Sequence, residues 1–234
     1  MEGFDKSKWI QVRLGDIASE YSERLNNPSE SEFNRFVGSS NISRWDFAIE
    51  SWEPTDSVTS AMKLFAANDY LLVRRSLYAS DFRERAPRAS FAGVCSGDIL
   101  TIKESSEEIV DGFLIAILNN PLLWKYIVAN ASGSITRRIK WRDLANYEFL
   151  LPPKDEQDLF VKLLYESEIS ISKEKNLICK LETCKKSMLK ELGSYEGANR
   201  LSVGELIDIE NGYAFSGEFI SSDESNMILM TPGN

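Results

Sequence analysis

The feature that most limits how this chain can fold is the stretch from Leu150 to Leu192. It opens with Leu-Leu-Pro-Pro-Lys-Asp-Glu-Gln at residues 150–157, and no further proline or glycine occurs before Gly193. Two prolines cannot continue the hydrogen-bond ladder of a strand, whereas acidic residues stabilise the positive end of a helix dipole. The chain is therefore expected to change from strand to helix here, and the helix is expected to continue to residue 192.

Apolar residues recur along this segment at spacings of three, four and seven, which places them on one side of a helix. At a rise of about 1.5 Å per residue the helix would be roughly 55 Å long, more than one small globule can cover. We therefore expect a partner helix, as in a bundle or a coiled coil. The stripe consists of Phe160, Leu163, Leu164, Ile171, Ile178, Leu181, Met188 and Leu192.

The composition allows a substantial core. The chain has 234 residues, of which 43% are hydrophobic and 27% charged, so there is room for one full domain plus a helical extension, or for two small domains. No apolar run approaches membrane-spanning length, and Met1–Lys6 does not lead into the hydrophobic stretch of a signal peptide. These observations predict a cytoplasmic protein without a membrane partner.

The sequence contains no histidine, which removes Ser-His-Asp, Cys-His and His–metal chemistry together. Its three cysteines, Cys95, Cys179 and Cys184, lack the spacing of a zinc site and are interpreted as buried thiols. No metal site and no bound cofactor are expected.

Motifs of DNA-modifying enzymes are also missing. There is no Gly-x-Gly that could form the methyl-donor loop of a methyltransferase, and no Glu is followed two residues later by the Lys of a common nuclease motif. The phosphate-binding sequence Gly-x-x-x-x-Gly-Lys-Ser/Thr is absent as well. The chain is therefore expected to be non-catalytic.

Short apolar runs bounded by turn residues predict an α+β unit ahead of the long helix. Within this unit we expect a small twisted β-sheet and several helices. Strands are predicted at 9–12, 33–37, 69–74, 97–102 and 147–151, and helices near Tyr21, at 109–118 and at 122–129.

The formal charge is −9, but it is unevenly distributed. No Lys or Arg follows Arg200, whereas two basic clusters occur earlier, at 74–88 and 137–142. The simplest interpretation is that these arginines pair with nearby acids such as Asp81, Glu84 and Asp143 on the surface. The tryptophans, including Trp45, Trp52, Trp124 and Trp141, are expected mainly to fill the core.

Arginine is nevertheless the side chain that contacts guanine edges and phosphates with two hydrogen bonds, and the hydroxyls beside the second cluster suit phosphate contacts. We therefore treat both clusters as candidate DNA-binding sites. The first choices are Ser134, Thr136, Arg137 and Arg138, with Lys140 in the same cluster and Arg74, Arg75, Arg83, Arg85 and Arg88 behind them.

Several motifs together resemble one family. Leu-Pro-Pro-Lys-Asp-Glu-Gln before a long heptad-like helix is similar to the DNA-specificity (S) subunit of type I restriction-modification systems, and Val37–Ile42 resembles a segment that follows the first loop in that family. Residues 201–207 echo residues 11–17, and Asn211–Phe219 resembles the opening of many recognition domains there. The final Pro-Gly-Asn at 232–234 resembles a segment that precedes a further Ile in the family.

This resemblance implies a division of the chain. Residues 1–153 would be a first target recognition domain, 154–192 a long spacer helix that forms a coiled coil, 193–200 a linker, and 201–234 the incomplete start of a second recognition domain. The loop before the Pro-Pro segment lies near the DNA in the family, which supports the ranking of the candidate residues.

By the same resemblance the chain would read one half of a bipartite target in double-stranded DNA. It would dock modification (methyltransferase) subunits on its helix, and a separate restriction subunit would carry translocation and cleavage. Two alternatives remain open: a half-length subunit that dimerises through 154–192 and reads a symmetric target, and a coiled-coil interaction module with no role on DNA.

Overall fold

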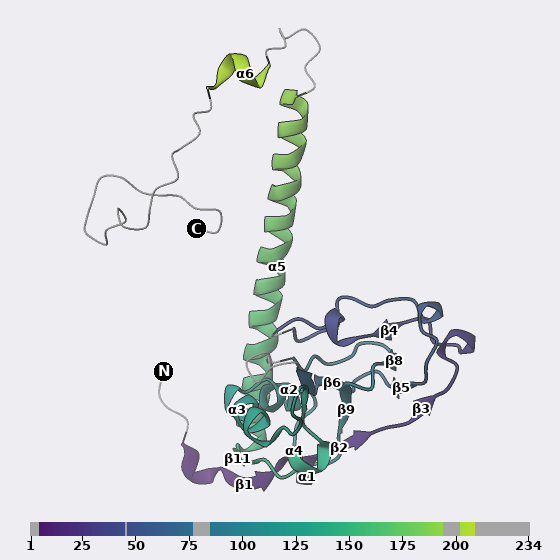
Figure 1. The fold of residues 1–234 in the computed structure, drawn as a ribbon. Coiled ribbons are helices and arrows are strands. Elements are labelled where there is room, and N and C mark those ends of the chain that lie inside the picture. The colour runs from purple at the N-terminus through teal and green to yellow at the C-terminus, as the bar shows by residue number, and fades with distance from the viewer. Residues whose placement is uncertain (1–4, 45, 77–84, 194–201, 209–234) are drawn as a thin grey trace, which may run out of the picture. The chain divides into compact units, whose positions relative to one another are not determined.

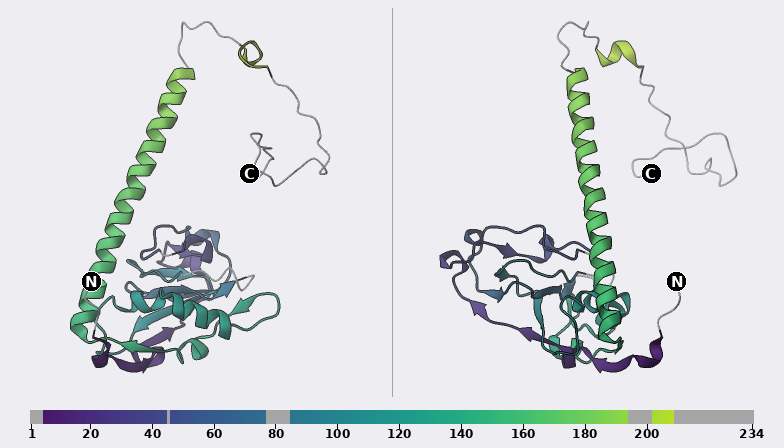
Figure 2. Two further views of the ribbon diagram at one scale, coloured as in Figure 1. Left: turned by 90° about the vertical axis from the view of Figure 1, so that its left-hand side faces the viewer. Right: turned by 180° about the vertical axis from the view of Figure 1, so that it is seen from behind.

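The computed structural model describes residues 5–44, 46–76, 85–193 and 202–208. The chain is divided between two compact units, Met1–Ile178 and Cys179–Asn234. Figure 1 shows the order of the elements, and Figure 2 shows the same ribbon from two further sides. The first unit holds the strands and most of the helices and is described first.

A two-stranded sheet pairs the first and the last of the described strands in the first unit. β1 (Ile10–Arg13) pairs antiparallel with β11 (Glu148–Leu151), so the first strand of the chain lies beside the last strand before the long helix. α1 (Leu14–Ile17) then packs against the end of α4 (Trp141–Leu144), where the backbone N–H of Gly15 donates to the carbonyl of Ala145. A Cβ atom at residue 15 would lie 3.1 Å from the Cβ of Ala145, so this close approach favours glycine.

Two larger sheets form the centre of the unit. β2 (Ala18–Tyr21), β9 (Ile99–Glu104) and β6 (Tyr70–Val73) make an antiparallel three-stranded sheet. β3 (Arg24–Leu25), β5 (Met62–Phe65), β8 (Gly93–Cys95) and β4 (Phe36–Val37) make a four-stranded sheet in which β4 runs parallel to β8. The remaining ladder, β7 (Arg75–Ser76) with β10 (Arg137–Arg138), belongs to the candidate site.

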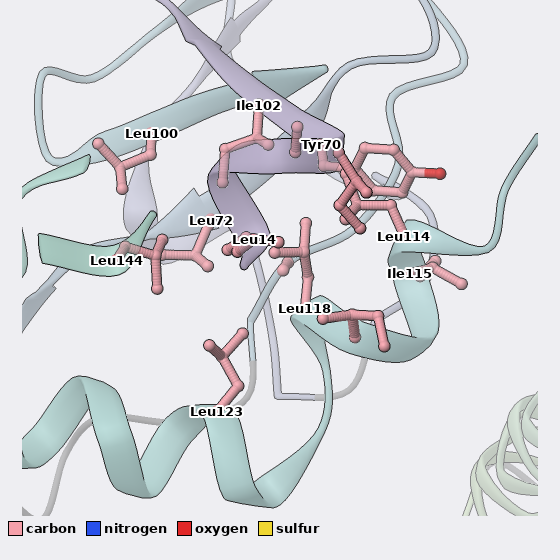
Figure 3. Packing of buried hydrophobic residues seen from close by; sticks show 14 of the residues in the cluster. Leu14, Tyr70, Leu72, Leu100, Ile102, Leu114, Ile115, Leu118, Leu123 and Leu144 are labelled. Carbon is pink, nitrogen blue, oxygen red and sulfur yellow. The ribbon is translucent and has the colours of Figure 1, made fainter. Parts of the chain in front are cut away.

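The described part of the first unit contains two hydrophobic cores, and the three-stranded sheet contributes side chains to both. In the larger core, Tyr70, Leu72 and Leu100 pack against α2 (Leu114–Leu118) and α3 (Pro121–Asn130), as Figure 3 shows. The smaller core lies between the two larger sheets, because it joins Leu71, Val73 and Ile99 of the three-stranded sheet to residues of the four-stranded sheet such as Phe65 and Cys95. In Figure 1 the four-stranded sheet lies on the side of the unit away from α2, α3 and the start of the long helix. Among the described residues, one short 3-10 helix, η1 (Lys6–Lys8), precedes β1. Three more lie between strands: η2 (Pro28–Glu30), η3 (Ser39–Asn41) and η4 (Thr55–Ser57).

The long helix is α5 (Lys154–Gly193), which begins within the Pro-Pro-Lys-Asp-Glu-Gln sequence as expected. Phe160, Val161 and Leu164 pack against the larger core. From Leu163 onward, the other members of the apolar stripe are exposed: Leu163, Ile171, Ile178, Leu181, Met188 and Leu192. In the second unit the structure also describes α6 (Val203–Leu206).

The α+β fold class with a long helix is confirmed, but three details differ from expectation. Where a single small sheet was predicted, the described residues form four small sheets. The segment ending at Tyr21 is not a helix but strand β2, which pairs with β9. Cys95 is buried, which raises the pKa of its thiol to about 12, but Cys179 and Cys184 are exposed on α5 because no described element covers that part of the helix.

No helix among the described residues is long and apolar enough to cross a membrane. The described residues also contain no cluster of carboxylates and thiols that could hold a metal ion. The expected linker lies outside the described residues apart from Gly193, as does most of 201–234, so the domain boundaries stay predictions.

Candidate nucleic-acid interface

The two basic clusters, at 74–88 and 137–142, meet in one ladder although they are far apart in sequence. Arg138 is the register partner of Arg75, and Arg137 is the partner of Ser76. The ladder is extended by the backbone N–H of Ile139, which donates to the carbonyl of Arg74 (3.1 Å). The fold therefore brings together side chains that the sequence analysis ranked as separate candidates.

A carboxylate holds the two clusters together. Asp98, at the turn before β9, accepts from Nη1 of Arg75 at 2.7 Å and from Nη2 of Arg138 at 3.1 Å. Its carbonyl accepts from the backbone N–H of Arg74 (3.0 Å). Because one negative charge lies between two guanidinium groups, the ladder keeps a net positive charge and a fixed geometry.

Beside the ladder lies an open hollow of about 250 Å3 lined by arginines. Within the described part of the chain, Arg24 and Arg74 have no ion-pair partner, and the Nε atom of Arg74 is buried without a hydrogen-bond partner. At Gly97 an added Cβ would meet no described atom within 4 Å, so there is open space beside this residue. The lining residues are Arg24, Arg74, Ser96, Gly97, Asp98 and Arg138.

Three positive side chains and one carboxylate around a small open hollow suit an anion with several acceptor oxygens, such as a phosphate. Arg24, Ser96, Gly97 and Asp98 were not candidates in the sequence analysis. Arg24 is separated from Arg74 by fifty residues, and only the pairing of the short strands places it here, so no local sequence signal identifies it.

The loop that enters β10 is tightly fixed. Gly133 has φ +132°, and a Cβ at this residue would lie 2.1 Å from the carbonyl oxygen of Thr136, so only glycine fits. The backbone of Ser132 exchanges two hydrogen bonds with Arg138, and the guanidinium of Arg137 donates to the carbonyl of Ala131. Arg137 therefore holds the loop closed while Arg138 is exposed.

At the tip of this loop the side chains are open to solvent. Ile135 is 83% exposed, and Ser134 and Lys140 are exposed as well, while Thr136 is half-buried. Ile135 was not a candidate from the sequence. An exposed isoleucine on a rigid loop beside cationic side chains is suited to apolar contact with a base, because the thymine methyl group projects into the major groove.

The other candidates lie apart from the hollow. Arg85 donates to the carbonyl of Ser39 at 3.3 Å. The side chain of Arg88 is only 16% exposed and forms a two-point ion pair with Asp111. Arg83 lies outside the described residues.

Among the tryptophans, Trp124 is buried, as expected for a core residue, and Trp45 lies outside the described residues. Trp52 is different, because it is substantially exposed and stacks with Arg35. The guanidinium of Arg35 lies 4.5 Å from the Trp52 ring and 4.4 Å from the Phe91 ring, over the four-stranded sheet. This cation–π arrangement fixes the Arg35 side chain at the surface.

The arrangement defines a class of fold: an α+β unit that pairs its first strand with its last and then continues into a long helix. Comparison with solved structures points to the same architecture. The chain is similar to the HsdS subunit from Thermoanaerobacter tengcongensis, with a TM-score of 0.56 and 16% sequence identity. It is similar to the same degree, at 17% identity, to a chain from a structure of complex assembly and conformational transition in a type I R-M system.

Each alignment covers 84% of this chain and 52% of the solved chain, so this chain spans about half the length of the structures it matches. No protein-family model matches the sequence, and no curated protein does. The expected resemblance to type I specificity subunits is therefore confirmed as a shared fold.

Proposed function

We propose that this chain is the non-catalytic DNA-specificity component of a type I restriction-modification complex. Its first unit reads one half of a bipartite double-stranded target, and α5 docks the modification subunits. The restriction subunit joins the same complex, which acts in the cytoplasm. The fold shared with HsdS supports this assignment, and the observation that carries it is the arginine-lined hollow beside the β7–β10 ladder.

In this proposal the hollow holds a backbone phosphate and the adjacent loop reads bases. Arg24, Arg74 and Arg138 supply charge-assisted hydrogen bonds, which position the protein without reading sequence. Ser134, Ile135 and Thr136 project from the same loop and can reach base edges. One fixed element thereby couples the register on the backbone to the reading of sequence.

The test is DNA binding by the chain assembled with its modification subunits. Replacing Arg24 and Arg74 together by Ala should weaken binding about ten-fold or more and reduce the slope of log affinity against log salt by about one. Arg13→Ala is the matched control, because Arg13 is an exposed arginine paired with Glu148 on the β1–β11 sheet. Equal losses in the two variants would mean that the hollow is not the phosphate site.

A second candidate function is self-association through α5, and the charge of the helix favours it. Residues 154–170 carry a net charge of −3, whereas residues 171–193 carry +3. Two copies aligned antiparallel would place each acidic half against a basic half and cover the exposed apolar stripe. This would correspond to a half-length subunit reading a symmetric target, or to an interaction module without DNA.

Sedimentation of the full chain separates these possibilities. A dimer that weakens as salt rises and survives the Arg24→Ala/Arg74→Ala change would support self-association through the helix. A chain that remains monomeric at micromolar concentration, but enters a complex with modification subunits, would support the leading proposal. DNA binding by the dimer would then decide between the half-length subunit and the interaction module.

A further inference from the structure

The first three turns of α5 are joined to the globular part of the first unit by polar contacts as well as by packing. The carboxylate of Glu156 accepts from the indole N–H of Trp9 at 2.9 Å. The ring of Phe160 meets Trp9 edge-on and lies beside Phe113. These contacts explain why a glutamate and an aromatic occupy these turns of the helix.

Gln157, the last residue of the Pro-Pro-Lys-Asp-Glu-Gln sequence, makes the most complete connection. Its side chain is buried, accepts from the backbone N–H of Val110 at 2.9 Å, and donates to the carbonyls of Glu108 (3.0 Å) and Pro152 (2.8 Å). One amide therefore ties the helix to the 108–110 segment and to the end of β11. Only a side chain with both a donor and an acceptor can make these three bonds.

A second connection is made two turns later, at Tyr165. The guanidinium of Arg88 is paired with Asp111, and it also donates a hydrogen bond to the hydroxyl oxygen of Tyr165. Burial alone would lower the pKa of Arg88, but these hydrogen bonds raise it, so the guanidinium stays charged. Gly112 has φ +85°, and a Cβ there would come within 3.4 Å of the Tyr165 hydroxyl, so the tyrosine ring lies directly against this turn.

We propose that Gln157 and Tyr165 are positioning residues that fix the direction of α5 on its globular unit, and thereby set the spacing between the two half-targets. The inference rests on the proposed function. A helix held at two points two turns apart resists tilting, whereas one held only by apolar packing can slide and rock. Both residues act through the helix and contact no DNA in this proposal.

The required accuracy follows from the length of the helix. From Tyr165 to its end α5 extends roughly 40 Å, so a tilt of about five degrees would move that end by roughly 3.5 Å. One base pair of DNA rises by about 3.4 Å. The complex can therefore select between spacers that differ by one base pair only if the first turns of α5 hold its direction within a few degrees.

The experiment uses the full chain assembled with its modification subunits. Sequencing of methylated plasmid DNA first identifies the target of the wild-type complex, and synthetic duplexes then carry the same half-targets with the spacer one base pair shorter, unchanged or one base pair longer. Tyr165→Phe keeps the ring and removes the hydroxyl. Tyr126→Phe is the matched control, because the Tyr126 hydroxyl donates to the carbonyl of Asp143, away from α5.

Tyr165→Phe should raise methylation of the altered spacers, relative to the unchanged one, by about five-fold, because one hydrogen bond to a charged network is lost. Gln157→Met, of similar volume, should have a larger effect, and the preference for each half-target should not change. Tyr126→Phe should behave as the wild type. Unchanged spacer selectivity in both α5 variants, or a changed half-target preference, would overturn the inference.

A second measurement tests the positioning role of Tyr165 without DNA. Spin labels at Leu122→Cys and Ser170→Cys, in a chain whose exposed Cys179 and Cys184 are replaced by Ser, report the direction of the helix within the first unit. Tyr165→Phe should broaden the distance distribution, and an unchanged distribution would count against the inference. A wild-type complex that methylates no bipartite target would overturn the proposed function itself, while the label distances would still test the positioning role.

Discussion

Asp98 determines how much of the arginine charge is available to a ligand. Its carboxylate bridges Arg75 and Arg138, one from each basic cluster, and its backbone carbonyl holds Arg74. The same carboxylate that orders the guanidinium groups also repels a phosphate that approaches them. Asp98 therefore fixes the orientation of the arginine side chains but lowers their affinity for a phosphate.

Asp98→Asn should remove this repulsion and keep a side chain of the same shape. In the complex with modification subunits, we expect affinity for unrelated DNA to rise about three- to ten-fold, and the salt slope to steepen by about one, because an additional cation becomes available. Discrimination between target and unrelated DNA should fall. Fluorescence anisotropy at several salt concentrations measures both; a loss of affinity for all DNA would mean that ordering of the arginines outweighs the repulsion.

Gly133 determines the conformation of the loop that enters β10, which we propose reads bases. Gly133→Ala would place a Cβ against the Thr136 carbonyl at a φ of +132°, so the loop must change its conformation at a cost of about 1–3 kcal/mol. We expect DNA affinity to fall, with a small decrease in melting temperature. Gly97→Ala is the control for folding, since an added Cβ there meets no atom, and its melting temperature should equal that of the wild type.

At the scale of elements, the long helix was predictable because proline, acidic residues and apolar spacing all point to it. The contacts of its first turns were not predictable, since Trp9 is far in sequence from its partner Glu156, and Val110 is far from its partner Gln157. Only part of the candidate site was predictable, because its residues too come from segments that are far apart in sequence. Each arginine cluster is visible in the sequence, but β7 and β10 have two residues each, too few for a periodic signal, so their pairing was hidden.

Glu168, in the fifth turn of α5, lies in an environment that disfavours the charged form of its carboxyl. Burial, together with the nearby carboxylates of Glu50 and Asp46, raises the pKa of Glu168, while Lys175 acts in the opposite direction. A carboxyl whose folded pKa is raised binds its proton more tightly in the folded state. Stability therefore falls as the pH rises from the unfolded value of about 4.5 through the folded pKa, and the loss persists at neutral pH.

Glu168→Gln should remove this loss of folding stability, so the variant should melt at a higher temperature than the wild type at pH 7. Because Glu168 is partly exposed, we expect about 0.5 kcal/mol or less. The difference should vanish below about pH 4.5, where the wild-type carboxyl is protonated in both states. Glu166→Gln, on an exposed residue of the same helix, is the control in a thermal melt at both pH values; a gain at pH 4 equal to that at pH 7 would contradict the electrostatic explanation.

At the scale of the whole molecule, the charge balance opposes the proposed partner. A formal charge of −9 repels DNA at long range, and the six acidic residues after Arg200 contribute much of it. The arginines of the hollow act only at short range, because salt screens charges beyond about 8–10 Å. In the proposed complex, the local cationic site of this acidic chain would select where DNA binds, while the partner subunits would supply much of the affinity.

This separation of roles leads to a measurable difference between the free chain and the complex. At about 0.1 M salt the isolated chain should bind a target duplex on the order of 100-fold more weakly than the chain assembled with modification subunits, and the salt slope should be steeper for the complex because more phosphates are contacted. Titration of one labelled duplex with each sample gives both quantities. Arg24→Ala/Arg74→Ala should weaken both samples by a similar factor, since the hollow belongs to this chain alone. Comparable affinities of the free chain and the complex would mean that the hollow and its loop suffice for binding, and that the acidic balance has little influence at the interface.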